Sequence, residues 1–367
     1  MIELPCYQFK GTAEQIGLAH GEELREPIKA FVEARFTAAR RYFGEEGFRT
    51  DDPVGGLRDT GRQCLEIVRE WDPPGYEEHV AIARGAGVDP VDLYTVVNYT
   101  DVRDAFMFAG SKPDSEGCTA LMIPPAKTAA GRGIGAQTWD LNPEDMEFVV
   151  AIHSQPVGEP ERWSLNTVGS QSLIGMNETG LCIGTTNIKT WDSRPGVGYI
   201  SILHRMLRSR SLAEARTVVP EAPRSGAHTY WMLDEQAGVQ FEATATSCVE
   251  TPLEDKPHAF TNHCLAGEHI PREYQPPGSS SQARYRRINR MLEAGDLSPE
   301  KVRDLFRSRE DGIDSICRYP EDNTGTATNT CAVFEPATRR ILACRGPADR
   351  GRWIELRFSG EGQAAPS

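Results

Sequence analysis

The 367-residue sequence predicts an α+β fold in which two stacked, mainly antiparallel sheets are flanked by helices. Three observations support this class. Residues 12–105 carry apolar side chains at the spacing of helices. From Cys118 onward the apolar residues fall in short runs bounded by Gly, Pro, Asn or Asp, which is typical of strands. Two groups of these runs are separated by helical segments, as expected when each sheet is covered by helices.

The part of the chain before Cys118 is predicted to be helical after a short strand in residues 1–10. One long helix is expected from about residue 12 to Phe43, because apolar side chains recur there at i, i+3 and i+4. The Pro73-Pro74-Gly75 step should end the helix that follows. The remaining helices are predicted at residues 55–70, 76–85 and 90–105, and a polar loop with Asp114, Ser115 and Glu116 then leads to Gly117.

The part of the chain from Cys118 onward is predicted to open with a meander of antiparallel strands. Within it, Asn177-Glu178-Thr179-Gly180 is a strong hairpin turn. The strands of the meander are expected at residues 118–123, 133–137, 147–153, 163–168, 172–176 and 181–186. Later strands are expected at residues 229–233, 239–245, 258–261, 329–334, 341–345 and 353–358, with helices at 200–208, 211–219, 283–293 and 298–308 and an exposed Pro- and Ser-rich loop at 265–282.

Composition and charge narrow the class of protein. The formal charge of −13 argues against a nucleic-acid partner, because phosphate binding needs a basic face. We expect no membrane-spanning segment and no secretory signal, since the N-terminus lacks a basic region followed by an apolar core. Nine cysteines stand singly, without C-x-x-C pairs or zinc-type spacing. These features predict a cytoplasmic protein with reduced thiols and no metal site.

The Gly117–Cys118 step is the candidate centre of chemistry. A cysteine that opens an apolar strand is most often a small buried hydrophobe. Here, however, Gly117 leaves its own carbonyl unhindered, and Thr119 and nearby carboxylates surround the bond. Attack of the thiol on the Gly117 carbonyl would give a thioester, and water would then release Cys118 as a new N-terminus. Its α-amine, with a pKa of about 7.7–8.0 in peptides, could serve as the base for the thiol.

Several motifs together resemble the acyl-coenzyme A:6-aminopenicillanic acid acyltransferase family, peptidase family C45. They stand in order along the chain: Gly117-Cys118-Thr119-Ala120-Leu121, Gln137-Thr138-Trp139-Asp140, Asn177-Glu178-Thr179-Gly180-Leu181, Thr261-Asn262-His263, Ser315-Ile316-Cys317-Arg318 and Arg345-Gly346-Pro347. The resemblance implies the αββα sandwich of N-terminal-nucleophile (Ntn) hydrolases. It also implies self-cleavage before Cys118, so that a helical pro-segment or α fragment, residues 1–117, stays associated with a β fragment, residues 118–367, in one domain.

The resemblance also suggests a role for each of three residues. Cys118 is similar to the nucleophile, Asp140 to the carboxylate that holds the nucleophile's α-amine, and Asn262 to the oxyanion donor. The residues themselves allow these roles, because a carboxylate favours a charged amine and an Asn amide is a common oxyanion donor. Asp140 could instead be a turn or N-cap residue before Asn142-Pro143, and Asn262 could also be a turn residue.

Four further residues are candidates for substrate binding or for support of the site: Thr119, Gln137, Asn187 and His263. A lone His after a strand is usually structural, and Asn187 could be a turn residue. Gln137 marks a departure within the superfamily, because the bile-salt and ceramide hydrolase branch carries an Arg shortly before the equivalent Asp. This difference favours the penicillin-acyltransferase-like branch.

The predicted function is that of a self-cleaving N-terminal-cysteine amidohydrolase or acyltransferase acting on a small-molecule amide or thioester through an acyl-enzyme on Cys118. Hydrolysis is favoured, because water needs no additional site. No cofactor is expected, except that a coenzyme A thioester could be the acyl donor. The alternatives are an acyl-CoA-dependent N-acyltransferase, an uncleaved thiol hydrolase with a Cys118–His263 dyad, and a non-catalytic relative. The expected partners are the substrate and the chain's own α fragment, and homo-oligomers stay open.

Overall fold

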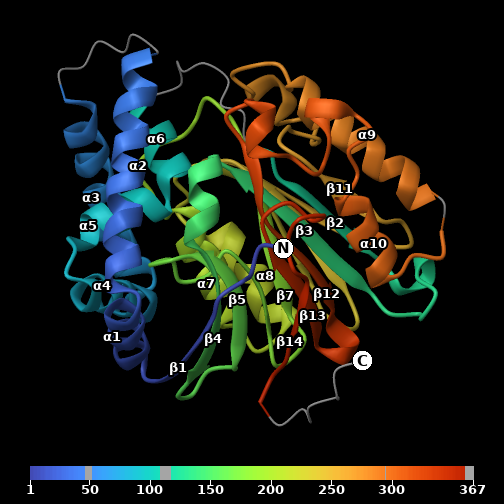
Figure 1. Cartoon of the computed structure of the whole chain (residues 1–367), viewed down its shortest axis with the longest axis horizontal. Coiled ribbons are helices and arrows are strands. Elements are labelled where there is room, and N and C mark those ends of the chain that lie inside the picture. The colour runs from blue at the N-terminus through green and yellow to red at the C-terminus, as the bar shows by residue number, and fades with distance from the viewer. Residues whose placement is uncertain (46–51, 108–116, 294, 360–367) are drawn as a thin grey trace.

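The computed structural model describes residues 1–45, 52–107, 117–293 and 295–359. Its elements form four layers, with two sheets stacked on one another and helices on both outer faces (Figure 1). The predicted α+β sandwich is therefore confirmed. Among the described residues, no helix is long and apolar enough to cross a membrane.

The helices form two groups on opposite sides of the sheets (Figure 1). The larger group covers one sheet and contains α1 (Ala13–Glu23), α2 (Arg25–Glu45), α3 (Pro53–Trp71), α4 (Pro73–Ala86), α5 (Pro90–Val97), α6 (Tyr99–Met107), α7 (Tyr199–Leu207) and α8 (Leu212–Glu221). The smaller group covers the other sheet with α9 (Ser279–Glu293) and α10 (Pro299–Phe306).

The first sheet has eight strands in the order β1-β4-β5-β6-β7-β8-β9-β10. All neighbouring pairs are antiparallel except β1 with β4, which run parallel. Its strands are β1 (Cys6–Gly11), β4 (Val149–Pro156), β5 (Arg162–Thr167), β6 (Ile174–Asn177), β7 (Cys182–Ile188), β8 (Ala227–Leu233), β9 (Gly238–Ala243) and β10 (Cys248–Pro252). The N-terminal segment thus supplies an edge strand as well as helices.

The second sheet has six antiparallel strands in the order β11-β2-β3-β12-β13-β14. They are β2 (Thr119–Ile123), β3 (Ile134–Leu141), β11 (His258–Phe260), β12 (Ala327–Glu335), β13 (Arg340–Arg345) and β14 (Ile354–Leu356). The meander predicted from Cys118 is therefore wrong in one respect. The chain leaves this sheet after β3 and enters the other at β4, so the first two strands do not pair with the rest.

Side chains of β2 alternate between two cores, as a strand buried on both faces requires. Ala120 and Met122 belong to the core between the sheets, whereas Leu121 and Ile123 pack with the apolar faces of α9 and α10. Cys118, directly before the strand, shares the inter-sheet face with Ala120. The strand pattern therefore directs the Cys118 side chain between the two sheets.

Two of the predicted helices are each divided in the structure. The helix expected from residue 12 to Phe43 is broken at Leu24, because Pro27 has no N–H to donate to the Glu23 carbonyl. The helix expected at residues 90–105 is broken at Asn98, whose Oδ1 accepts the Ile200 N–H at the start of α7. The polar loop predicted at Asp114, Ser115 and Glu116 lies outside the described residues.

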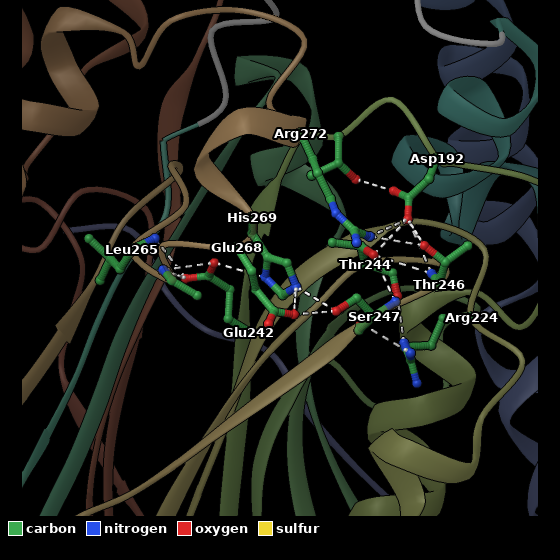
Figure 2. Close-up of polar contacts among 12 residues, drawn as sticks. Asp192, Arg224, Glu242, Thr244, Thr246, Ser247, Leu265, Glu268, His269 and Arg272 are labelled. Carbon is green, nitrogen blue, oxygen red and sulfur yellow. Dashed lines mark hydrogen bonds and ion pairs between the residues drawn. The ribbon is translucent and has the colours of Figure 1, made fainter.

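The segment predicted as an exposed loop, residues 265–282, is held to the first sheet by a polar cluster with a buried centre, called here the loop anchor (Figure 2). Its centre is His269, which is fully buried between Glu242 and Ser247, 3.0 Å from an oxygen of each. Glu242 also accepts the backbone N–H groups of Leu265 and Ala266. The other members are Asp192, Thr244, Thr246, Glu268 and Arg272.

Candidate active site

Cys118 directly precedes β2, and its buried side chain lies in the core between the two sheets. It lines a small cavity of about 20 Å³ together with residues from both sheets and from the helical layer. Such a volume holds about one water molecule. The residues around it include Thr100, Trp139, Asp140, Thr185, Asn187, Tyr199 and His228.

Gly117 packs closely against two side chains of the site. A Cβ at this position would collide with the Arg318 guanidinium and would lie 3.0 Å from Asp140 Oδ2. The Gly117 N–H also faces the Asp140 backbone carbonyl at 3.5 Å. The bond between Gly117 and Cys118 is thus held directly beside the Asp140 carboxylate.

Asp140 lies near the end of β3 and is 1% exposed. No hydrogen bond of good geometry reaches either carboxylate oxygen from the described residues. Burial raises the pKa of Asp140 from 3.8 to about 6, although the positive charges of Arg284 and Arg318 and, to a lesser extent, the nearby Thr328 and Thr138 hydroxyls oppose the rise. A buried carboxylate without a well-directed donor is costly, so this side chain is well placed to accept a further cationic group.

Arg284, on the buried face of α9, links the parts of the site. It is fully buried and donates hydrogen bonds to the Cys118 carbonyl, to Thr119 Oγ1 at 2.9 Å and to Asn262 Oδ1 at 2.9 Å. Burial lowers its pKa to about 10, which still leaves it charged at neutral pH. Sequence reasoning missed this residue. Its position one turn before Ile288 and Leu292, on an otherwise apolar stripe, was the available signal.

Asn262 follows β11 and lines a second, larger cleft of about 370 Å³. Because Arg284 donates to its Oδ1, the amide group is oriented with Nδ2 toward β7. One N–H of Nδ2 donates to the Asn187 carbonyl at 3.0 Å. An amide nitrogen carries two N–H groups, so the second is left for a ligand.

Asn187, in β7, connects the two hollows, because it lines both the cavity at Cys118 and the larger cleft. It is 7% exposed, and both polar atoms of its side chain lack a hydrogen-bond partner among the described residues. A buried amide with no partner needs an explanation, and a bound ligand would supply one.

The other three sequence candidates lie around this centre. Thr119 is buried on the α9 side, where its hydroxyl accepts from Arg284. Gln137 joins the two sheets, since its side chain bonds to both the N–H and the carbonyl of Thr185 and accepts the Trp231 indole N–H. All three bonds are internal to the protein.

His263 lies on the α9 side of the site. Its Nδ1 bonds to Ser281 Oγ at 2.8 Å and to Thr261 Oγ1 at 3.1 Å. Burial, reinforced by the charge of Arg284, lowers the pKa of His263. His263 is not among the residues that line the cavity at Cys118.

The histidine that does line the cavity at Cys118 is His228 in β8, which sequence reasoning missed. Its Nε2 lies 2.6 Å from Asp101 Oδ1, and its Nδ1 has no hydrogen-bond partner among the described residues. Asp101 is itself fixed by the Tyr199 N–H at 2.8 Å. An imidazole that is paired with a carboxylate therefore borders the same space as Cys118.

Comparison with known proteins matches residues 127–349 to the family described as acyl-coenzyme A:6-aminopenicillanic acid acyl-transferase. The matched segment begins after Cys118. A comparison with curated proteins finds no match. In the described part of the chain, no group of three or more His, Cys, Asp or Glu side chains could hold a metal ion.

Solved structures with similarity include enzymes from two bacteria. One is a mutant conjugated bile acid hydrolase from Clostridium perfringens, with 10% identity and a TM-score of 0.42 over 67% of this chain and 93% of that one. Another is penicillin V acylase from Agrobacterium tumefaciens, with 13% identity and a TM-score of 0.41 over 65% of this chain and 86% of that one. Because the family match spans more than half of the sequence, the chain belongs to the acyl-coenzyme A:6-aminopenicillanic acid acyl-transferase family.

Proposed function

We propose that this chain is the precursor of a cysteine amidohydrolase that cuts its own Gly117–Cys118 bond and then hydrolyses small amides. One observation carries the proposal above all. The bond lies beside Asp140, whose buried carboxylate has no well-directed hydrogen-bond donor among the described residues and only the Thr138 and Thr328 hydroxyls nearby. The ammonium group released by cleavage would supply the missing donor and charge.

In the cleavage step, the Cys118 thiol loses its proton and the sulfur attacks the Gly117 carbonyl carbon. The carbon–nitrogen bond breaks, the proton passes to the departing Cys118 nitrogen, and a thioester remains. Water then hydrolyses the thioester, which leaves a Gly117 carboxylate, a free thiol and a free α-amine. Arg284 supports this geometry because it holds the Cys118 carbonyl and so fixes the residue on the far side of the bond.

In turnover, the Cys118 α-amine takes the thiol proton and the thiolate attacks the substrate's amide carbonyl. The free N–H of Asn262 would donate to the developing oxyanion, with its amide oriented by Arg284. The α-ammonium returns a proton to the leaving amine, and an acyl-thioester forms. Water, deprotonated by the same amine, then releases the acid.

Acyl transfer is the alternative to hydrolysis at this centre. It differs only in the group that attacks the acyl-enzyme, an amine in place of water. The family description names an acyl-coenzyme A donor and an aminopenicillanic acid acceptor, which supports transfer as a related activity. We favour hydrolysis, because water needs no binding site of its own.

The proposal is tested by intact-mass measurement and N-terminal sequencing of the purified protein. We expect two fragments, with the larger one beginning at Cys118, and a single uncut chain for the Cys118→Ala variant. A screen of acyl anilides should then give activity in the cut protein alone. Cleavage at the same bond in Cys118→Ala would overturn the proposal, as would full activity in a chain that stays uncut.

A second candidate function is that of an uncleaved thiol hydrolase, and the position of His228 favours it. His228, which is paired with Asp101, borders the cavity of Cys118, so it could deprotonate the thiol without a free α-amine. In that case the active chain would show one full-length mass. Activity would then be lost in His228→Gln and retained in the matched His263→Gln variant.

A further inference from the structure

The larger cleft adjoins the site of Cys118 and has a volume of about 370 Å³. Asn187 lines both hollows, and Asn262 and Arg318 connect the cleft to the residues around the Gly117–Cys118 bond. Its size suits a small organic ligand. The charges along its wall therefore bear on which substrates could reach the nucleophile.

Lys189, directly after β7, is the unusual member of that wall. The residue is 8% exposed, and its Nζ atom has no hydrogen-bond partner among the described residues. Charged side chains are rarely buried without a partner, because the loss of hydration is not repaid. An ammonium in this position is explained if a ligand brings the matching anion.

Each of the two acidic residues that line the cleft accepts a hydrogen bond from a neutral donor. Glu273 accepts the Cys264 N–H at 2.7 Å, and Asp314 accepts the Ser279 hydroxyl at 3.2 Å. Arg318 adds a second positive charge to the wall. The cleft thus presents Lys189 as a cation whose partner is missing, close to the proposed oxyanion donor Asn262.

Two neutral groups of the cleft also lack partners within the described residues. They are both polar atoms of the Asn187 side chain and the Oε1 atom of Gln275. Several unsatisfied polar atoms thus line this cleft, which indicates a surface built to bind a polar ligand.

We propose that Lys189 binds a carboxylate of the substrate, so that the enzyme selects amides that carry a negative charge. This inference rests on the proposed function, because it takes Cys118 as the group that reacts from this cleft. The formal charge of the chain is −13, so the protein as a whole repels anions. Any preference for an anionic substrate must therefore come from local groups, and Lys189 is a cation of the cleft whose Nζ has no hydrogen-bond partner among the described residues.

The test compares anionic and neutral reagents that differ only in one group. Rates of labelling at Cys118 are measured by peptide mass spectrometry with 3-maleimidopropionate and 6-maleimidohexanoate, each against its carboxamide. The background carries Cys6→Ser, because Cys6 is an exposed thiol. The variants are Lys189→Met and Lys189→Gln, which remove the charge, and Lys189→Arg, which keeps it. Lys256→Met is the matched control, since it removes one exposed positive charge.

We expect the anionic-to-neutral rate ratio to fall about tenfold in Lys189→Met and Lys189→Gln at one or both reagent lengths, as for the loss of one charge-assisted hydrogen bond. Lys189→Arg should keep most of the ratio and Lys256→Met all of it. An unchanged ratio in both neutral variants at both lengths would overturn the inference.

The same samples separate this inference from the proposed function. A lowered ratio in a chain whose mass is still full-length would support the anion site and contradict self-cleavage. Two fragments with an unchanged ratio would do the reverse. In the cut enzyme, glutaryl-p-nitroanilide should have a lower KM than pentanoyl-p-nitroanilide, and Lys189→Met should raise the first KM about tenfold with little change in kcat.

Discussion

Two polar clusters of this protein are alike in composition but differ in how many of their polar atoms have hydrogen-bond partners. The loop anchor around His269 joins carboxylates, hydroxyls and an imidazole, and Glu242 alone receives two backbone N–H groups and lies 3.0 Å from His269 (Figure 2). The cluster around Cys118 leaves the carboxylate of Asp140 and the amide of Asn187 without partners in the described chain. The polar groups of the first cluster have hydrogen-bond partners within the protein. Those of the second cluster could gain partners from a bound molecule or from a new chain end.

The comparison shows why residue types alone are a poor guide to a site. Ser247, His269 and Glu242 lie in the order of a serine–histidine–acid triad, with 3.0 Å at each step. Yet the Ser247 hydroxyl donates to Glu268, and His269 is fully buried, so the group ties a loop to a sheet. Unpaired polar atoms beside a cleft are the better indicator of function.

Among variants of the two clusters, Asn262→Ala should have the largest effect, and that effect should be on kcat. Loss of one oxyanion donor lowers kcat by about 10²–10³-fold. Stability should fall by only about 1 kcal/mol, because Asn262 is partly exposed at the cleft, although Arg284 loses one acceptor. Steady-state kinetics and urea unfolding of the variant measure both quantities. Asn289→Ala, on the same side of the molecule, is the control and should retain full activity. A kcat within threefold of the native value would rule Asn262 out as the donor.

The raised pKa of Asp140 should make the free energy of unfolding depend on pH. Its pKa is about 6 in the folded precursor and 3.8 when unperturbed, so the native state holds the proton more tightly. Stability contributed by this group is therefore present below about pH 4 and lost as the pH rises through about 6. In an uncut Cys118→Ala background, Asp140→Asn should gain about 2–3 kcal/mol relative to Asp140 between pH 4 and pH 8. A gain that does not vary with pH would contradict the assigned cause.

In contrast to Asn262→Ala, Glu242→Gln should lower stability more than it lowers kcat. The amide has one acceptor oxygen, and its NH₂ group would face the N–H donors of Leu265 and Ala266. We expect a loss of about 2 kcal/mol in the free energy of unfolding, with kcat within a few-fold of native. Urea titration followed by kinetics provides the measurement. Glu268→Gln, on the exposed side of the anchor, is the matched control. Equal losses in both variants would argue against a special role for Glu242.

The smallest effect is expected from Arg272→Met. Its guanidinium lies 3.7 Å from Asp192, and the side chain is 41% exposed. Exposed ion pairs of this kind contribute about 0.2–1 kcal/mol, and salt screens them. Thermal unfolding at low and high ionic strength should therefore differ between native and variant protein only at low salt. A larger loss that persists in high salt would place Arg272 among the essential groups of the anchor.

The fold was largely predictable because its strands and helices follow local patterns. The runs that predicted β2 and β7 match the structure closely, since burial on both faces gives continuous apolar segments. The breaks at Leu24 and Asn98 were missed for different reasons. Pro27 is visible in the sequence and was overlooked, whereas Asn98 interrupts its helix in order to bond to α7, more than a hundred residues away.

The candidate site was predictable only where a motif marks it. Cys118, Asp140 and Asn262 lie in short recognisable segments, and the structure brings all three close to Arg284. Arg284 itself is 166 positions from Cys118 and lies in a helix with no motif. Lys189 is similarly unmarked. Its interest comes from the lack of a hydrogen-bond partner for Nζ among the described residues, which only the packing of several elements can reveal.

The pairing of β1 with β4 has a consequence for how the enzyme could be unfolded and recovered. The strand comes from the segment before Gly117 and forms the edge of a sheet whose other strands come from the segment after Cys118. Once the bond is cut, folding would change from a unimolecular to a bimolecular reaction. Recovery after denaturation would then depend on protein concentration, and dilute samples would lose their structure irreversibly. The cut enzyme would thus keep a structure that formed while its two fragments were still one chain.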